Sequence, residues 1–247
     1  MTMLATAERL TGSPKPSIGP RCEFCRQPVA SEQKFCGACG AVLTVRCERK
    51  QTTVLFLDVC GFTAMSERLD PEDVRTIMDR AFDVILDTVH AHGGSVNQFL
   101  GDGVMALFTE IEGAEPHAVR GLRAAVAIQN DLAVVRADVQ RAHGVDFRVR
   151  AALHTGPVTM GVIGRGLRND YVSRGETTNI AARLVNMARG EQILVSTRTR
   201  ELTMGAFVFA ALDDGSADSD PSPFPAWLVA WEPCDRVDAE LGLVTEV

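Results

Sequence analysis

Two pairs of cysteines near the amino terminus have the spacing of a metal-binding site. Two residues separate Cys22 from Cys25 and Cys36 from Cys39, and ten residues lie between the pairs. Four thiolates in this pattern complete a tetrahedral structural Zn²⁺ site and leave no open position for catalysis. A segment of about 20 residues is too small to fold without such support. We therefore predict a zinc ribbon over residues 21–43. The remaining cysteines are interpreted as ordinary small residues: Cys47, Cys60 and Cys234.

Two aspartates at the ends of predicted strands suggest a second kind of metal site. Asp58 ends the apolar run 53–57, and Asp102 lies between two glycines at the tip of a predicted hairpin. Carboxylates bind Mg²⁺ and Mn²⁺, and two of them can bridge a pair of ions about 4 Å apart. The turn at residues 61–63 opens a helix, where backbone amides can accept phosphate oxygens. Each feature alone is typical of a cap or a turn, but together they favour metal-assisted chemistry on a phosphate compound.

Alternating strand and helix patterns position these side chains. Asp70, Pro71 and Asp73 predict the start of a helix, and Gly93 predicts its end. A turn is expected at Thr155-Gly156. The other predicted elements are strands at 53–58, 96–100, 104–108, 147–154, 157–163, 192–196 and 224–231 and helices at 116–143 and 177–188. The order βαββαββ predicts an α+β, ferredoxin-like fold with an antiparallel-rich sheet and helices on one face.

Four segments, in order along the chain, resemble the motifs of class III adenylate and guanylate cyclases. They are VLFLDVCGFTAMS at 54–66, FLGDGVMA at 99–106, LHTGPV at 153–158 and NIAARL at 179–184. The resemblance covers residues 52–202 and implies a class III nucleotide cyclase domain. Such an enzyme converts a nucleoside triphosphate into a 3′,5′-cyclic nucleotide and pyrophosphate by two-metal catalysis, and the product is a second messenger.

The resemblance also implies roles for individual residues at the interface of a head-to-tail homodimer. Asp58, Asp102 and the backbone of Val59 would bind two Mg²⁺ or Mn²⁺ ions in each active site. Phosphate would be held by backbone amides of the next turn, at Gly61, Phe62 and Thr63. The second subunit would contribute Asn179, which positions the ribose, and Arg183, which stabilises charge on the transferring phosphorus. Without the motifs, an Asn–Arg pair four residues apart is typical of a solvated helix face.

The positions that read the base depart from the family pattern. Gln98 stands where adenylate cyclases have Lys, and Val172 stands where they have Asp or Thr. Neither residue matches the Glu with Cys or Ser that is usual in guanylate cyclases. Arg174 can only donate hydrogen bonds, which favours keto oxygens such as those of guanine or uracil, or it forms an interface salt bridge. Prevalence in the family favours ATP, with GTP, UTP or CTP as alternatives; a pyrimidine substrate would imply antiphage signalling.

Composition limits the remaining possibilities. The formal net charge of −7 opposes sequence-independent binding to nucleic acid. No apolar run is long enough to span a bilayer, and no secretory signal is recognisable, so we expect a cytoplasmic protein. The alternative to an active enzyme is a catalytically silent module that binds a nucleotide or a partner. The ribbon is also a candidate surface for a protein partner.

The predicted division of the chain follows from these patterns. It comprises a flexible leader at 1–20, the zinc ribbon at 21–43, a linker at 44–51, the cyclase domain at 52–211, an acidic loop at 212–223 and a terminal strand and tail at 224–247.

Overall fold

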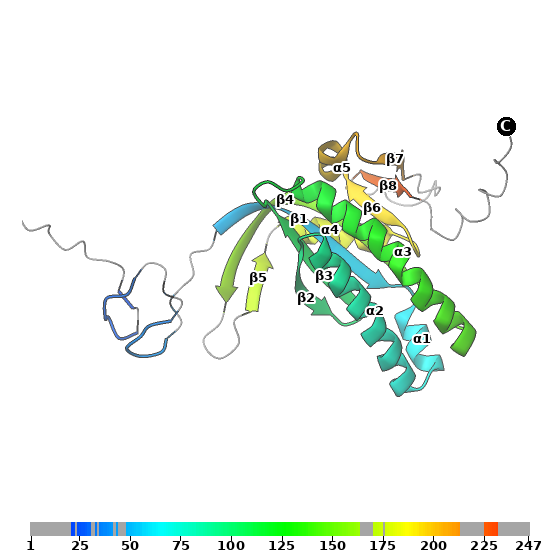
Figure 1. Ribbon diagram of the computed structural model, residues 1–247, viewed down its shortest axis with the longest axis horizontal. Coiled ribbons are helices and arrows are strands. Elements are labelled where there is room, and N and C mark those ends of the chain that lie inside the picture. The colour runs from blue at the N-terminus through cyan, green and yellow to red at the C-terminus, as the bar shows by residue number, and fades with distance from the viewer. Residues whose placement is uncertain are drawn as a thin grey trace, which may run out of the picture. The chain divides into compact units, whose positions relative to one another are not determined.

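The computed structural model describes two compact units (Figure 1). The described residues are 21, 22, 24–30, 33, 35–41, 43, 48–163, 170–174, 176–212 and 225–231, without the side chains of 160–163 and 170–174. The ribbon segment belongs to the smaller unit, and most of the chain from residue 47 onward belongs to the larger one. The predicted leader, nearly all of the predicted acidic loop and two cysteines, Cys47 and Cys234, lie outside the described residues.

The larger unit is built on an eight-stranded sheet. Its strand order is β2-β3-β1-β4-β6-β8-β7, and β5 pairs with β4 outside this path. The strands are β1 (Glu48–Val59), β2 (Ser95–Leu100), β3 (Gly103–Thr109), β4 (Val149–Ile163), β5 (Asp170–Arg174), β6 (Ile193–Ser196), β7 (Val208–Ala211) and β8 (Ala226–Ala230). The pairs β1–β3, β1–β4, β2–β3, β6–β8 and β7–β8 are antiparallel, and β4 pairs with β6 in parallel. The predicted α+β class with an antiparallel-rich sheet is therefore confirmed.

Helices connect these strands and cover both faces of the sheet. They are α1 (Phe62–Arg68), α2 (Pro71–Ala91), α3 (His117–His143), α4 (Glu176–Met187) and α5 (Thr197–Thr203). In Figure 1, α2 and α3 lie side by side, and α3 packs on β1 and β3. Across the described residues, none of the helices combines the length and apolar composition needed to cross a bilayer.

The prediction that helices lie on one face is wrong. Leu55 and Leu57 of β1 belong to a core shared with α2 and α3, whereas Val54 and Phe56 belong to a second core shared with α4. Successive side chains of a strand point to opposite faces, so β1 is apolar on both sides. A sheet of this kind must be covered on both faces, and α4 covers the second one.

The predicted turn at Thr155-Gly156 is also wrong, because β4 runs unbroken through both residues. Thr155 pairs with Thr53 and Gly156 pairs with Thr52 of β1. A Cβ on Gly156 would lie only 2.6 Å from Thr177 Oγ1, so the glycine makes room for the first turn of α4. The glycine therefore serves a close approach between a strand and a helix and not a reversal of the chain.

Other boundaries differ from the sequence prediction by a few residues. β1 begins at Glu48, inside the stretch predicted as linker, because residues 48–51 pair with residues 157–160 of β4. Helix α5 and strand β7 were not predicted. The helices α2, α3 and α4 and the strand β8 match their predicted ranges to within two residues.

Candidate functional site

The two predicted metal ligands are brought together by strand pairing. Asp58 is the penultimate residue of β1, and its Cα partner in β3 is Gly103. Asp102 immediately precedes Gly103, in the turn between β2 and β3. Both aspartates are half-buried. Adjacent carboxylates at one end of neighbouring strands are the arrangement expected for hard cations such as Mg²⁺ and Mn²⁺.

A glycine keeps the space beside Asp58 open. A Cβ at Gly103 would lie 3.0 Å from Leu57 O and 3.4 Å from Asp58 Oδ1. A side chain at residue 103 would crowd the Asp58 Oδ1 atom. The residues present therefore fit the divalent ions that the sequence predicts: two hard oxygen donors and a small residue between them.

Arg150, which was not predicted from the sequence, holds the other oxygen of Asp58. In β4, Arg150 is the Cα partner of Asp58, and its Nε and Nη2 donate to Asp58 Oδ2 at 2.8 and 2.6 Å. Both side chains are 24% exposed. Arg150 Nη1 also donates to Asn186 O and Ala188 O, each at 3.2 Å, at the carboxyl end of α4. One guanidinium thus orients Asp58, leaves Oδ1 toward Gly103 and neutralises the helix end.

Helix α4 presents the predicted pair Asn179 and Arg183 on its exposed side. Its buried face consists of Thr177, Ala181, Leu184 and Val185. Asn179 and Arg183 are both exposed and lie one turn apart. Their predicted contacts with the ribose and the transferring phosphorus remain predictions.

The turn after Asp58 has the predicted local geometry. Gly61 adopts φ 69° as the N-cap of α1, and its carbonyl accepts from the Met65 amide at 3.0 Å. Phe62 and Thr63 follow in the first turn of this short helix. Burial raises the pKa of the neighbouring Cys60 thiol, so that thiol is neutral at physiological pH. The predicted phosphate contacts of this turn, and the contact of the Val59 backbone with metal, remain predictions.

A β-bulge sets the direction of Gln98. The pairing of β2 with β3 shifts between Val96 and Gln98, so Asn97 is the extra residue. Gln98 pairs with Met105, a member of the core on the α4 side of the sheet, and is exposed. The side chains of the other two proposed base-reading residues, Val172 and Arg174 in β5, lie outside the described part of the structure.

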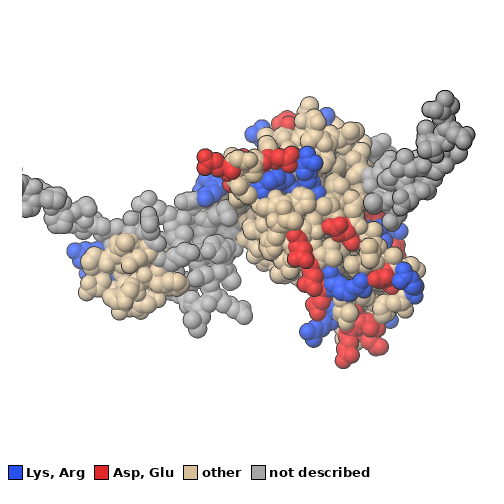
Figure 2. All heavy atoms as spheres, in the orientation of Figure 1, with Lys and Arg blue, Asp and Glu red and all other residues tan. Residues whose placement is uncertain are grey.

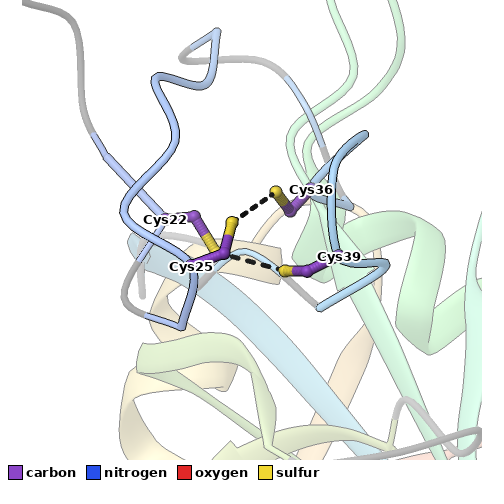
Figure 3. A group of neighbouring side chains, drawn as sticks. All are labelled: Cys22, Cys25, Cys36 and Cys39. Atoms are coloured by element: carbon purple, nitrogen blue, oxygen red, sulfur yellow. Dashed lines mark hydrogen bonds between the residues drawn. The ribbon is translucent and has the colours of Figure 1, made fainter.

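The four cysteines of the smaller unit converge on one point (Figure 3). Their sulfur atoms all lie within 4.8 Å of one another. The Cys22–Cys39 and Cys25–Cys36 sulfurs are 3.7 and 3.5 Å apart. A tetrahedral ZnS₄ centre with Zn–S bonds of about 2.3 Å has sulfurs about 3.8 Å apart. The cluster therefore has the size of a structural zinc site.

Backbone amides prepare these sulfurs for a cation. Amide hydrogen bonds from Ala38 and Cys39 lower the pKa of Cys36 to about 6. An amide hydrogen bond from Cys25 is the largest of the causes that lower the pKa of Cys22. The amide of Gln27 also lowers the pKa of Cys25, but burial and the other three sulfurs outweigh it and raise that pKa to about 12. Close thiolates without a cation repel one another, which is the situation that bound zinc relieves.

Charged side chains of both signs are intermingled on the face of the larger unit that Figure 2 shows. On α2 and α3, for example, Arg80 and Arg141 both bind Asp138, at 2.8 and 3.0 Å. The face of the larger unit that Figure 2 shows therefore presents charge of both signs among its described residues.

The fold and the aspartate pair define a class III cyclase domain, and the comparison with known families agrees. Residues 45–217 match the family described as the adenylate and guanylate cyclase catalytic domain. This match covers more than half of the chain, so the chain belongs to that family.

Individual relatives include cyclases of both base specificities. Adenylate cyclase 1 of Rhizobium meliloti is 35% identical over 151 residues, which is 60% of this chain and 23% of that protein. The crystal structure of the adenylyl cyclase CyaB from P. aeruginosa superposes with a TM-score of 0.68 at 27% identity, covering 77% of this chain and 99% of that one. The guanylyl cyclase Cya2 superposes with a TM-score of 0.66 at 28% identity, covering 76% and 97%. The chain thus spans about a quarter of the length of the Rhizobium protein.

Proposed function

We propose that the protein is an active nucleotide cyclase that forms a 3′,5′-cyclic nucleotide and pyrophosphate from a nucleoside triphosphate. The observation that supports the proposal is the pairing of Asp58 with Gly103, because it brings the neighbouring residue Asp102 to the same end of the two strands. When bound, two Mg²⁺ or Mn²⁺ ions would activate the ribose 3′-hydroxyl and neutralise the triphosphate. Asp58 and Asp102 would hold these ions, as the donor set described above allows.

The remaining residues of the site would position and stabilise the reacting groups. Arg150 holds Asp58 Oδ2, so Oδ1 would be left to bind a metal ion before substrate arrives. The amides at the start of α1 would bind phosphate oxygens. Asn179 would hold the ribose, and the fork of Arg183 would stabilise charge on the transferring phosphorus. The exposure of both α4 side chains supports a head-to-tail homodimer in which they act on the partner's metal site.

The substrate base is proposed from the chemistry at Gln98. An amide can donate to a keto oxygen or accept from an exocyclic amine, so Gln98 alone accommodates several bases. ATP is the expected substrate because the family relatives include adenylate cyclases. GTP, UTP and CTP are the alternatives, since Cya2 is a guanylyl cyclase and the base-reading pair of adenylate cyclases is absent.

The ribbon is proposed to bind one structural Zn²⁺ and to contact a protein partner. Four cysteines gathered as metal ligands are typical of a reducing compartment, which supports the expected cytoplasmic location. Phe24 and Phe35 are 63% and 53% exposed, although aromatic side chains are usually covered. Two exposed aromatic rings on a small unit favour a protein surface as the partner.

The first experiment is direct. Purified protein is incubated with Mn²⁺ and each of ATP, GTP, CTP and UTP, and the products are identified by mass spectrometry. We expect a cyclic nucleotide from at least one triphosphate, none with Asp58→Ala, and full activity with Asp83→Asn, an exposed carboxylate of α2. Folded, zinc-loaded protein that forms no product from any triphosphate would contradict the proposal and favour a silent binding module.

A mixing experiment tests the shared site. Asp102→Asn and Arg183→Ala each remove one half of the proposed site, so each variant alone should be inactive. In a heterodimer of the two variants, one active site is intact. An equal mixture should therefore recover about a quarter of wild-type activity once subunits exchange. Recovery of no activity by a mixture shown to contain heterodimers would contradict the head-to-tail arrangement.

A further inference from the structure

A continuous chain of hydrogen bonds crosses the larger unit between two histidines. It runs from His117, the first residue of α3, to His154 in β4. Four buried hydroxyls lie between them, in the order Thr53, Thr155, Thr199 and Ser196. The successive distances are 2.8, 2.8, 3.1, 3.2 and 2.7 Å. We call this chain the relay. It includes His154 and Thr155 of the third cyclase-like motif, to which the proposed catalytic cycle assigns no role.

The number of available hydrogens gives the relay a direction. Its five bonds need five hydrogens, and its four hydroxyls supply four, so an imidazole Nδ1–H must supply the fifth. The Thr199 hydroxyl donates to Thr155 at 3.1 Å, whereas its other acceptor, Leu153 O, is 3.5 Å away. With this donation fixed, His154 Nδ1–H stands at the donating end. His117 Nδ1 is then the acceptor at the other end.

Charged groups face both ends of the relay. His117 Nε2 lies 3.4 Å from an oxygen of Glu110, whose side chain is exposed to solvent, and Arg120 is its other charged neighbour. Glu176 is the charged neighbour of His154. Burial lowers the pKa of both imidazoles and outweighs the two carboxylates, so both histidines are neutral at neutral pH.

Helix α4 begins at the His154 end of the relay. The point that a Cβ on Gly156 would occupy lies 2.6 Å from Thr177 Oγ1 and 3.5 Å from His154 Nε2. The two side chains therefore converge over the same glycine. Thr177 lies in the first turn of the helix that carries Asn179 and Arg183. Small shifts at this end of α4 are transmitted directly to both residues.

We propose that the relay couples proton uptake to the position of α4, with His154 as the positioning residue. A proton bound at His154 Nε2 allows the Nδ1 hydrogen to pass to Ser196, and each hydroxyl then accepts one proton and gives one up. His117 Nδ1 receives the last proton and becomes an imidazolium beside the Glu110 carboxylate. One proton has entered, one is held at His117, and His154 is left neutral with its hydrogen on Nε2.

The consequence is that His154 Nε2 changes its hydrogen-bonding role beside helix α4. In the resting relay, His154 Nε2 is an acceptor; after proton transfer it is a donor beside Gly156, over which Thr177 also packs, and Glu176 is its charged neighbour. The new donor draws the first turn of α4 toward β4 and displaces Asn179 and Arg183. This inference rests on the proposed function, because only a catalytic α4 makes the displacement matter for turnover. We expect acid to lower kcat more than KM through this route.

Histidine NMR tests the relay without turnover. The chain has five histidines, so His→Gln variants assign each imidazole in ¹⁵N-labelled protein. We expect the Nδ1–H tautomer for His154 at neutral pH, conversion to Nε2–H on acidification and accumulation of charge on His117. Thr53→Val removes one hydroxyl and should uncouple the two titrations, whereas Thr53→Ser should preserve the coupling. Identical His154 titrations in wild type and Thr53→Val would overturn the proposal.

Kinetics then tests the effect on α4. The ratio of kcat in Thr53→Val to kcat in wild type should rise about threefold between about pH 7.5 and about pH 5.5. The matched control is Thr52→Val, because Thr52 is also fully buried in β1 but donates to Lys50 O at 3.3 Å, outside the relay. The ratio of kcat in Thr52→Val to kcat in wild type should stay constant over the same pH range. A flat ratio for both variants, with the NMR coupling present, would overturn the link to α4; an inactive wild type with the NMR coupling present would instead overturn the proposed function.

Discussion

The close approach of β4 to α4 makes Gly156→Ala the most informative single substitution. The added Cβ would lie 2.6 Å from Thr177 Oγ1 and 3.3 Å from Thr177 Cγ2. Thr177 is buried, its side chain is short and branched, and its hydroxyl donates to Pro157 O at 2.9 Å. The side chain therefore cannot swing away, and the first turn of α4 must move instead. Reaching an ordinary contact of 3.4 Å requires a displacement of about 0.8 Å.

Two measurable losses follow from that displacement. Overpacking of a core by one methyl group costs about 1–3 kcal/mol, which lowers Tm by about 3–10 °C in a domain of this size. A catalytic group misplaced by about 1 Å costs up to about 100-fold in rate. We expect kcat for the preferred triphosphate with Mn²⁺ to fall about 10- to 100-fold, because Asn179 lies half a turn beyond Thr177.

A control and a rescue separate this mechanism from general damage. In Gly190→Ala the new Cβ meets Arg148 Cδ at 2.7 Å and Arg148 Cβ at 3.2 Å. The Arg148 side chain is flexible and 47% exposed, so activity and Tm should change much less than in Gly156→Ala. Adding Thr177→Ala to Gly156→Ala removes both clashing atoms and should restore most of kcat. Wild-type kcat and Tm in Gly156→Ala, or no recovery in the double variant, would refute the reasoning.

Three further predictions follow from other parts of the structure. Arg150→Gln should lower the free energy of unfolding by about 2 kcal/mol in urea titrations, because the charge-assisted bonds to Asp58 and to the end of α4 are lost; a change below about 0.5 kcal/mol would contradict their importance. Atomic absorption should find one zinc per chain in the wild type and none in Cys36→Ser, and a zinc-free wild type with a folded ribbon would exclude the metal. Since the pKa values of His117 and His154 are lowered in the folded chain, only the unfolded chain takes up these protons as the pH first falls below 6.5. Stability should therefore be constant above that pH and decline below it, with a smaller decline in His117→Gln; equal declines would show that His117 is not responsible.

Local signals were sufficient to predict the elements that carry the metal ligands. Asp70 and Pro71 mark the start of α2, and the glycines around Asp102 mark the β2–β3 hairpin. These signals are local because they arise from backbone geometry that few residues adopt. The turn predicted from Gly156 was wrong, because this glycine is needed for close packing against helix α4, which begins 20 residues further along the chain.

Arg150 and the relay could not be found from local patterns. Arg150 is 92 residues from Asp58 in sequence, and only the register of β1 against β4 makes them neighbours. The relay likewise joins residues of five elements through strand pairing and helix packing. In contrast, the covering of both sheet faces did have a sequence signal: the unbroken apolar run 54–57 is typical of a strand buried on both sides.

The double role of Arg150 has an evolutionary consequence. If Asp58 is lost first, the guanidinium keeps its carbonyl partners at the end of α4, and the fold is little affected. If Arg150 is lost first, a half-buried carboxylate and a helix end lose their cation together. Lineages that abandon catalysis should therefore discard the aspartate before the arginine. Descendants that retain the arginine opposite a neutral residue would be the recognisable remnants of former cyclases.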